Sequence, residues 1–237
     1  MKQLLALAVA VWTTPLLAAH GDLIEVPADY MFVPTGFDDN DEVEIVLDGY
    51  LPSYCYRLTQ PGVEVNIGER KILVQQGARY FPALCFDIPT PFTAIVRIGR
   101  LPTGHYEMAT RDGRLKEKLS VAASRYEHSD DHFYAPVEAA HIISSEYGHR
   151  AILEGRFTSK CFSLREVRVL NRGKIVEVLP IIGYRETEPG CPKNQNWFRE
   201  EVAIPRLDAA FPRVLLHVRS ANGRSVNTVF SQTPKND

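Results

Sequence analysis

The chain has 237 residues, 45% of them hydrophobic and 24% charged, with 15 Gly and 16 Pro. This composition is typical of a globular protein of one or two domains and excludes disordered, collagen-like and low-complexity chains. The formal net charge of −2 provides no general basic face, so we expect no nucleic-acid partner.

The first segment, 1–19, has the layout of a secretory signal peptide. Lys2 gives a basic start, an apolar run follows over 4–12, and the segment ends in two alanines. The run is too short to cross a membrane as a helix, and no later stretch is long enough either. The alternative is a buried N-terminal helix, but Pro15 argues against it. We therefore expect a periplasmic or secreted protein whose mature chain has no membrane span.

Four cysteines reveal an internal repeat. Cys55 and Cys85 are 30 residues apart (85 − 55), Cys161 and Cys191 are also 30 apart (191 − 161), and the offset between halves is 106 (161 − 55). Several other residues recur at this offset. They include the pairs Leu47 and Leu153, Gly49 and Gly155, Arg79 and Arg185, Phe92 and Phe198, Val96 and Val202, and Ile98 and Ile204. A repeat of this length predicts a duplicated domain.

The duplication selects one of the three pairings that four cysteines allow. Each domain must carry its own bridge, which predicts Cys55–Cys85 and Cys161–Cys191. Each bridge closes a loop of about 31 residues and should stabilise its domain by roughly 3–4 kcal/mol. A zinc site would need closely spaced Cys or His pairs, and a catalytic cysteine would break the symmetry.

Alternating apolar residues predict β-strands in both halves. Apolar and polar residues alternate in the first half over 43–48 and 92–98. In the second half Val167 and Val169 indicate one short strand, Ile175, Val176 and Val178 indicate another, and 215–218 is a β-rich apolar run. No segment shows sustained helical periodicity, so the sequence predicts an all-β chain.

Two glycine-containing pairs predict the last hairpin of each half. Asp112-Gly113 and Asn222-Gly223 are preferred two-residue turns, because these residues tolerate a positive φ. They place hairpins at 106–121 and 214–230. The offset here is 110 (222 − 112), which predicts a four-residue insertion near 208–212.

Strand spacing, about 105 residues per unit and one bridge per unit predict two tandem immunoglobulin-like β-sandwich domains. After the leader, we assign 20–124 to the first domain, 125–132 to a linker and 133–237 to the second. The linker is short and polar, so the domains should sit close together with limited swing. We expect each domain to fold alone, as loosely joined modules.

The first half contains a recognisable motif string. It comprises Gly49-Tyr50-Leu51-Pro52, Cys55-Tyr56, Cys85, Pro91-Phe92 and Leu101-Pro102-Thr103-Gly104-His105-Tyr106. This string resembles a loosely defined group of immunoglobulin-like repeats in bacterial secreted proteins. The second half keeps the cysteines and the phenylalanine but lacks both Leu-Pro pairs, so its resemblance rests on the duplication. The resemblance implies fold and export only.

Histidines and acids suggest two candidate metal sites. In the linker, His128 and His132 flank Asp130 and Asp131, a donor set suited to zinc or copper. Cleavage after residue 19 would also expose the amine and imidazole of His20, which together chelate copper. In both places a polar segment without metal is the alternative.

The acidic run Asp38-Asp39 and Asp41-Glu42 is interpreted as a solvated turn. Calcium binding is the alternative, because oxygen ligands are dense there, although the run lacks the spacing of an EF-hand.

Aromatic residues near the cysteines are candidate ligand contacts. Trp197 follows the amides Asn194, Gln195 and Asn196, a combination that suits sugar recognition. Packing of Trp197 on the disulfide is the alternative. Tyr50, Tyr54 and Tyr56 surround Cys55 and are expected either to form an adhesive patch or to cover the bridge.

No catalytic motif supports an enzyme: the sequence has no Gly-x-Ser-x-Gly, no His-Glu-x-x-His and no phosphate loop. We expect an exported, non-catalytic binding or structural module that recognises a protein or glycan partner. One alternative is a periplasmic pilus-assembly chaperone, but such chaperones are usually basic and carry a long donor strand. The other is a copper protein that uses His20.

Overall fold

The computed structural model describes residues 22–82, 85–127, 130–146, 148–185, 191, 193 and 195–232. The predicted leader and His20, His128 and Asn194 lie outside this part of the chain. The described residues form strands, turns and loops and contain no helix, as the alternating pattern predicts. The strands of the first half are β1 (Asp22–Val26), β2 (Tyr30–Phe32), β3 (Phe37–Asp38), β4 (Val43–Leu51), β5 (Tyr56–Leu58), β6 (Gly62–Asn66), β7 (Lys71–Tyr80), β8 (Thr90–Gly99), β9 (Gly104–Thr110) and β10 (Lys116–Ala122).

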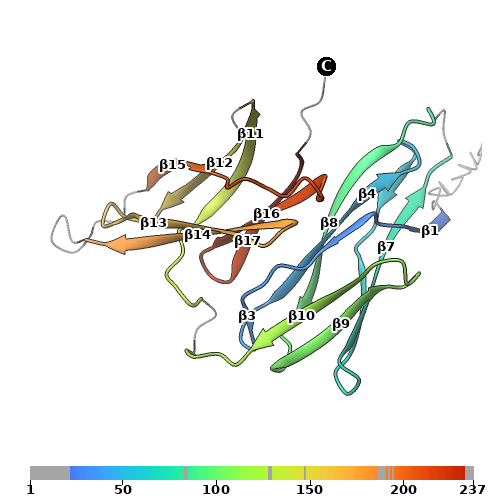
Figure 1. The fold of residues 1–237 in the computed structure, drawn as a ribbon, viewed down its shortest axis with the longest axis horizontal. Helices are drawn as coiled ribbons and strands as arrows, with labels where there is room; N and C mark the ends of the chain where they lie inside the picture. The colour runs from blue at the N-terminus through green and yellow to red at the C-terminus, as the bar shows by residue number, and fades with distance from the viewer. Residues whose placement is uncertain are drawn as a thin grey trace, which may run out of the picture.

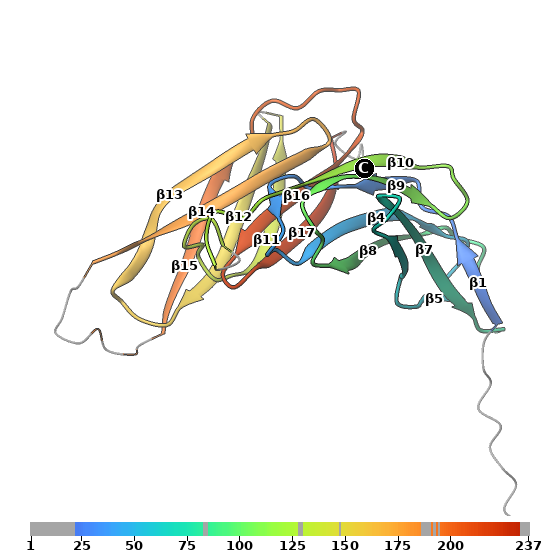
Figure 2. The ribbon, with the colours of Figure 1, turned by 90° about the horizontal axis from the view of Figure 1, so that it is seen from below.

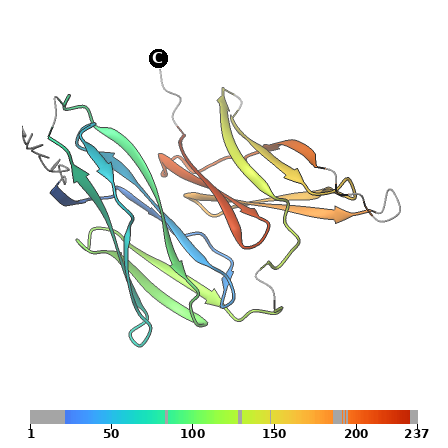
Figure 3. The same cartoon turned by 180° about the vertical axis from the view of Figure 1, so that it is seen from behind.

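The sheets group into two halves that lie side by side (Figures 1 and 3). Within the described residues, no strand of one half pairs with a strand of the other. The strands of the second half are β11 (Val137–Ser145), β12 (Gly148–Phe157), β13 (Phe162–Asn171), β14 (Ile175–Tyr184), β15 (Asn196–Ala203), β16 (Arg213–Ser220) and β17 (Arg224–Ser231).

The halves share one topology, which extends the repeat from sequence to structure. A three-stranded sheet β2-β4-β8 corresponds to β11-β12-β15. The opposite sheet contains the hairpin β6-β7, a parallel pair β7-β9 and the hairpin β9-β10, matched by β13-β14, β14-β16 and β16-β17. The parallel pair in each half departs from the antiparallel sheets of an immunoglobulin domain.

Each half buries one core between its two sheets. In the first half, inward residues of β4 and β8 such as Leu47 and Val96 share a core with Ile72 and Met108 of the opposite sheet. The second core is built in the same way, from Leu153 and Val202 facing Val176 and Leu216. Burial of these aliphatic side chains is the main stabilising contribution to each half.

Both predicted disulfides are confirmed. Cys55–Cys85 and Cys161–Cys191 each have a Cα–Cα distance of 5.8 Å. Each bridge ties the segment that enters a hairpin (β5 to β7, or β13-β14) to the segment that leaves it. Neither bridge joins the facing sheets in the manner of an antibody domain.

The final hairpins are where the sequence places them, but their turns are longer than predicted. Ser220 pairs with Arg224, so three residues form the second turn, and Asn222 and Gly223 have φ of 63° and 66°. In the first hairpin, the backbone N–H of Thr110 donates to the carbonyl of Leu115, with Gly113 at φ 71°. Positive φ is confirmed at Gly113, Asn222 and Gly223 but not at Asp112, and the expectation of two-residue turns is wrong.

A dry apolar patch joins the halves. Phe32 of β2 and Val46 of β4 are fully buried against Ile175 of β14 and Leu215 of β16. These residues lie on the outer faces of their sheets, so the β2-β4 face of the first half packs on the β14-β16 face of the second. We call this contact the domain interface, and Figure 2 shows the strands that form it side by side.

Charged groups surround the apolar patch. Arg213 donates to Asp48 through Nη2 at 2.8 Å to each carboxylate oxygen and through Nε at 3.0 Å, and Asp48 is only 1% exposed. A second polar contact joins the halves: the backbone N–H and the hydroxyl of Thr35 donate to Oε1 of buried Glu177, at 2.6 and 2.7 Å. The halves are therefore packed together, and the expectation of loosely joined modules is wrong because outer strand faces are buried between them.

Removal of Arg213 tests the domain interface. Arg213→Ala leaves the Asp48 carboxylate buried with one hydroxyl donor, Thr93 at 3.0 Å, and should cost about 3–5 kcal/mol of unfolding free energy. The control is Arg150→Ala, which removes an exposed pair with Glu201 at 2.7 Å and should cost below about 1 kcal/mol. Urea unfolding measures both, and equal losses would mean that the Asp48 pair is hydrated in solution.

Acid should weaken the fold through His217, which is fully buried on β16. Its Nδ1 lies 2.7 Å from Oδ1 of Asn227, and its ring meets Phe37 edge-on. Burial, aided by nearby Arg219, lowers the pKa of His217 to about 3. The stability from this neutral ring is complete above the unfolded pKa of about 6.5. It is lost as pH falls towards 3, by up to about 1.4 kcal/mol per pH unit.

Between about pH 4 and 6, the titration of Asp41 changes the unfolding free energy in the direction opposite to that of His217. Burial raises the pKa of Asp41 to about 6, while Arg219 opposes the rise, so its contribution is largest at low pH and is lost as pH rises from about 4 to 6. Comparing urea unfolding at pH 8 and pH 5 separates the two groups. His217→Gln should flatten the acid loss and Asp41→Asn should steepen it; an unchanged slope in His217→Gln would show that the ring titrates normally.

Candidate binding surface

The turn that carries each first cysteine is built in the same way in both halves. In the first half, Ser53 accepts from the backbone N–H of Cys55 through its hydroxyl (3.3 Å) and from that of Tyr56 through its carbonyl (3.3 Å). Ser159 does the same for Cys161 and Phe162, at 3.2 Å in both cases. The shared Ser-x-Cys pattern is a signal that the sequence analysis missed.

Four exposed apolar side chains gather at the bridged end of the first half. Tyr50 ends the outer face of β4, Tyr54 occupies the Ser53 turn, and Phe86 and Ile88 follow Cys85 on the way to β8. Their exposed fractions lie between 50% and 68%. We call these four residues the bridge patch.

The backbone brings the bridge patch together. The disulfide holds the Cα atoms of Cys55 and Cys85 5.8 Å apart, so Tyr54 and Phe86, next to them in the chain, belong to the same end of the first half. Tyr50 pairs with Pro91 across β4 and β8, and the N–H of Ile88 donates to the carbonyl of Phe86 at 2.8 Å in a tight turn. Exposed apolar groups concentrated in one place are unusual on a monomer and typical of interaction sites.

The three predicted tyrosines are not equivalent. Tyr50 and Tyr54 project into solvent, whereas Tyr56 is half-buried, with its ring centroid 5.0 Å from that of Tyr80. Tyr56 therefore packs on the core side of the bridge. Phe86 and Ile88 were not predicted, because two apolar residues in a loop give no periodic signal.

Trp197 lies on the outer face of β15 and is 65% exposed. It pairs with Arg156 of β12, whose guanidinium carbon is 4.7 Å from the Trp197 ring centroid and whose Nε donates to Glu138 of β11 at 2.8 Å. The ring is thus held by a cation–π contact and does not bury itself on the disulfide. Gln195 and Asn196 are exposed beside it, and Asn194 lies outside the described residues.

The predicted linker metal site is only partly described. Asp130 accepts from the backbone N–H of Asn222 at 2.9 Å and of Gly223 at 3.0 Å, so it caps a hairpin turn of the second half. Asp131 and His132 line a hollow of about 540 Å³ between the linker and β14. Among the described residues, no group of three His, Cys, Asp or Glu side chains is placed to hold a metal ion.

The acidic run near residue 40 is structural, which corrects its interpretation as a solvated turn. Asp39 accepts from the Ser124 backbone N–H at 2.9 Å and the Thr103 hydroxyl at 3.0 Å, and these bonds lower its pKa. Asp41 is buried 3.8 Å from Arg219 of the second half. The run therefore fastens β3 to the rest of the fold and to the domain interface.

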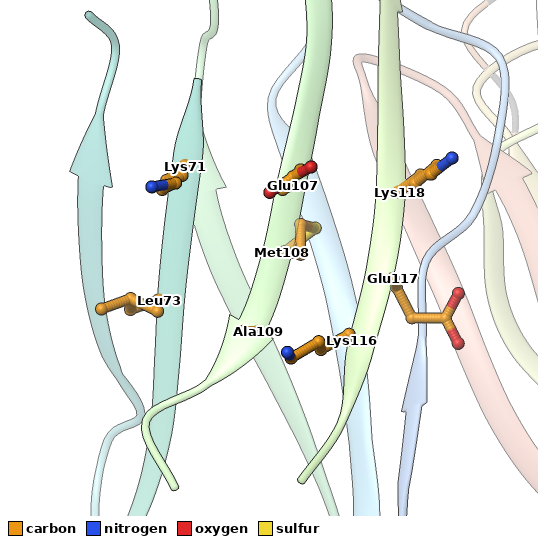
Figure 4. Close-up of a pocket in the computed structure, with 8 residues that line it drawn as sticks. All are labelled: Lys71, Leu73, Glu107, Met108, Ala109, Lys116, Glu117 and Lys118. Atoms are coloured by element: carbon orange, nitrogen blue, oxygen red, sulfur yellow. The ribbon is translucent and has the colours of Figure 1, made fainter. Parts of the chain in front are cut away.

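A shallow hollow of about 710 Å³ lies over the outer face of β7, β9 and β10 (Figure 4). The strand register aligns Lys71, Glu107 and Lys118 in one row across it. Leu73 and Ala109 form an apolar floor in the next row, beside Lys116. Charges of both signs alternate on this open face, so it has the character of a solvated sheet surface.

Within the described residues, no helix is long and apolar enough to cross a membrane.

No protein-family model matches the chain, and no curated protein or solved structure matches it either.

Loss of the first disulfide should weaken the fold and free the bridge patch. Replacing Cys55 and Cys85 together by serine should lower the unfolding free energy by about 2–5 kcal/mol. Cys161–Cys191 should still form, because each bridge closes its own hairpin. Because the halves share the domain interface, calorimetry should show one shifted transition. Non-reducing peptide mapping checks the second bridge, and two separate transitions would contradict the coupling of the halves.

Proposed function

We propose that this protein is an exported, non-catalytic binding module of two immunoglobulin-like β-sandwich domains, and that it recognises a protein partner through the bridge patch. The observation that carries the proposal is the gathering of Tyr50, Tyr54, Phe86 and Ile88, all at least half exposed, on a disulfide-braced end of the fold. Export to the periplasm or the exterior is supported by the leader-like segment and by two disulfides, which persist in oxidising compartments.

The composition of the bridge patch favours a protein over a small ligand. Tyrosine and phenylalanine supply large contact areas with few rotatable bonds, and they are enriched in interface cores. No deep cavity accompanies the patch among the described hollows, which lie elsewhere on the molecule. The Ser53 turn and the bridge hold Tyr54 and Phe86 in place, which lowers the entropy lost on binding.

Glycan recognition is supported by a separate feature, the exposed Trp197 beside Gln195 and Asn196. One face of the indole faces the guanidinium of Arg156, so a sugar ring would need the other face. This is a second candidate ligand class for the same module and involves the second half only.

Site-specific photo-crosslinking in the native host tests the bridge patch. A photo-reactive amino acid at position 54 or 86 should give a discrete adduct with one partner, and the same probe at Phe133 should not. Phe133 is a matched control because it is 76% exposed and lies in the linker region. Adducts of equal yield from all three positions would show non-specific contact and contradict the proposal.

A second experiment replaces residues of the bridge patch by their equivalents in the second half. Tyr54→Lys and Tyr50→Arg each introduce the residue found at the equivalent position of the second half, Lys160 and Arg156, so the fold should accept them. We expect the captured partner to be lost from the double variant while its circular dichroism is unchanged. Undiminished capture would contradict a role for the bridge patch. A glycan array with wild type and Trp197→Ala tests the second ligand class.

A further inference from the structure

Strand β8 has a free edge. It is the last strand of the sheet β2-β4-β8, and within the described residues it pairs with β4 alone. In Figure 2 it runs along the border of the first half, beyond β4. β6 of the facing sheet approaches part of β8 without pairing with it, so the unpaired backbone groups along the rest of this ten-residue strand are available to another strand.

The equivalent strand of the second half is protected, and β8 is not. At the repeat offset of 106, Thr93-Ala94-Ile95 of β8 corresponds to Arg199-Glu200-Glu201 of β15. Arg199, Glu200 and Glu201 are all exposed, so β15 presents three consecutive charges along its edge. Charged side chains on an edge strand are a known defence against pairing with other chains. The corresponding stretch of β8 has no charge.

The other long edges of the described structure are also guarded. β17 is covered by β11, since the Thr228 hydroxyl donates to the carbonyl of Ala140 at 2.9 Å. β13 has an irregular register between Leu164 and Glu166. Edge strands β1, β10 and β13 carry the charged residues Asp22, Glu25, Lys116, Glu117, Lys118, Arg165, Glu166 and Arg168. In β8, Pro91 and an irregular register at Ile98 lie at the two ends of the strand, and the stretch between them carries one charge, Arg97.

The residues of β8 are complementary to a second, antiparallel copy of themselves. With Ile95 facing its own copy across a two-fold axis, Ala94 faces Val96 and Arg97 faces Thr93 (95 + 95 = 94 + 96 = 97 + 93). Apolar residues meet apolar residues on the inner face, and the two arginines are kept apart. The same arrangement of β15 would be centred on Glu201 and would place the two copies of Glu201 against each other, which is unfavourable.

We propose that β8 is a dimerisation edge: two copies of the protein pair through antiparallel β8 strands centred on Ile95 and form one continuous six-stranded sheet. The occupant of the free edge is thus a second copy of this chain, in an isologous two-fold contact. This surface is distinct from the bridge patch, which lies at the end of β8 where the strand begins.

Sedimentation velocity of the oxidised mature chain over a wide concentration range tests the proposal. Wild type should dimerise, and Ile95→Glu, which sets two carboxylates against each other at the two-fold axis, should raise the dimer dissociation constant by about tenfold or more. The fold should accept glutamate at this position, because Ile95 is 39% exposed and Glu201 occupies the equivalent position of the second half. Ala203→Glu introduces the same charge at an exposed site of β15 and should leave the dissociation constant unchanged. A wild type that stays monomeric throughout, or an Ile95→Glu protein that dimerises like wild type, would overturn the proposal.

Cysteine crosslinking tests the register independently of affinity. In the proposed pair, Ile95→Cys faces its own copy and should form an interchain disulfide on mild oxidation. Thr93→Cys faces position 97 of the other copy, four residues from its own equivalent, and should not crosslink. Ile95 is 39% exposed, so its replacement leaves the core intact. Crosslinking through Thr93→Cys but not Ile95→Cys would reject the pairing centred on Ile95.

Discussion

The buried ion pair between Asp48 and Arg213 determines how the two halves of the molecule meet. The apolar contact of Phe32, Val46, Ile175 and Leu215 stabilises the domain interface, but apolar burial is non-directional and would tolerate small displacements. A carboxylate that is 1% exposed does not tolerate them, because a shift by one residue along β4 would leave its charge buried without the guanidinium. The domain interface thus combines an apolar patch that supplies stability with an ion pair that selects one geometry.

The domain interface joins non-equivalent faces of a duplicated fold. The β2-β4-β8 side of the first half packs on the β14-β16-β17 side of the second, so the corresponding faces β7-β9-β10 and β11-β12-β15 stay free. A head-to-tail contact of this kind can in principle continue without limit. The face β7-β9-β10 prevents this by carrying charge where the domain interface carries aliphatic groups, since Ile175 and Leu215 correspond by strand pairing to Lys71 and Glu107. The face β11-β12-β15 differs from the interface face in charge, since Glu44 corresponds by the 106-residue offset to Arg150.

The sequence alone predicts the features that are set by residues near one another in the chain. It does not predict the features that arise when the two halves pack together. Cysteine spacing predicts both bridges, and the Asn-Gly and Asp-Gly pairs predict both hairpins, because these features are set by residues near one another in the chain. The domain interface leaves weaker signals. Val46 is apolar on the outer face of an otherwise alternating strand, and 214–216 is apolar on both faces, as expected of a strand buried on both sides. Nothing in the alternation identifies Asp48 and His217 as buried, since their burial depends on a surface more than 160 residues away.

Comparing the two halves distinguishes the features that the fold requires from the surface positions at which the halves differ. The two halves agree where the fold requires it: the Ser-x-Cys turn, the bridge and the parallel strand pair are shared. They differ at surface positions that the fold leaves free. At those positions the first half has Tyr50, Tyr54, Thr93 and Ile95 where the second has Arg156, Lys160, Arg199 and Glu201. An exposed apolar side chain or an open strand edge carries a risk of aggregation, which charge at the same position removes. Because the same backbone accepts the charged residues in the second half, the apolar set in the first half is not demanded by folding. The bridge patch and the β8 edge, which we propose as contact surfaces, therefore both lie in the first half, and the second half packs against it through the domain interface.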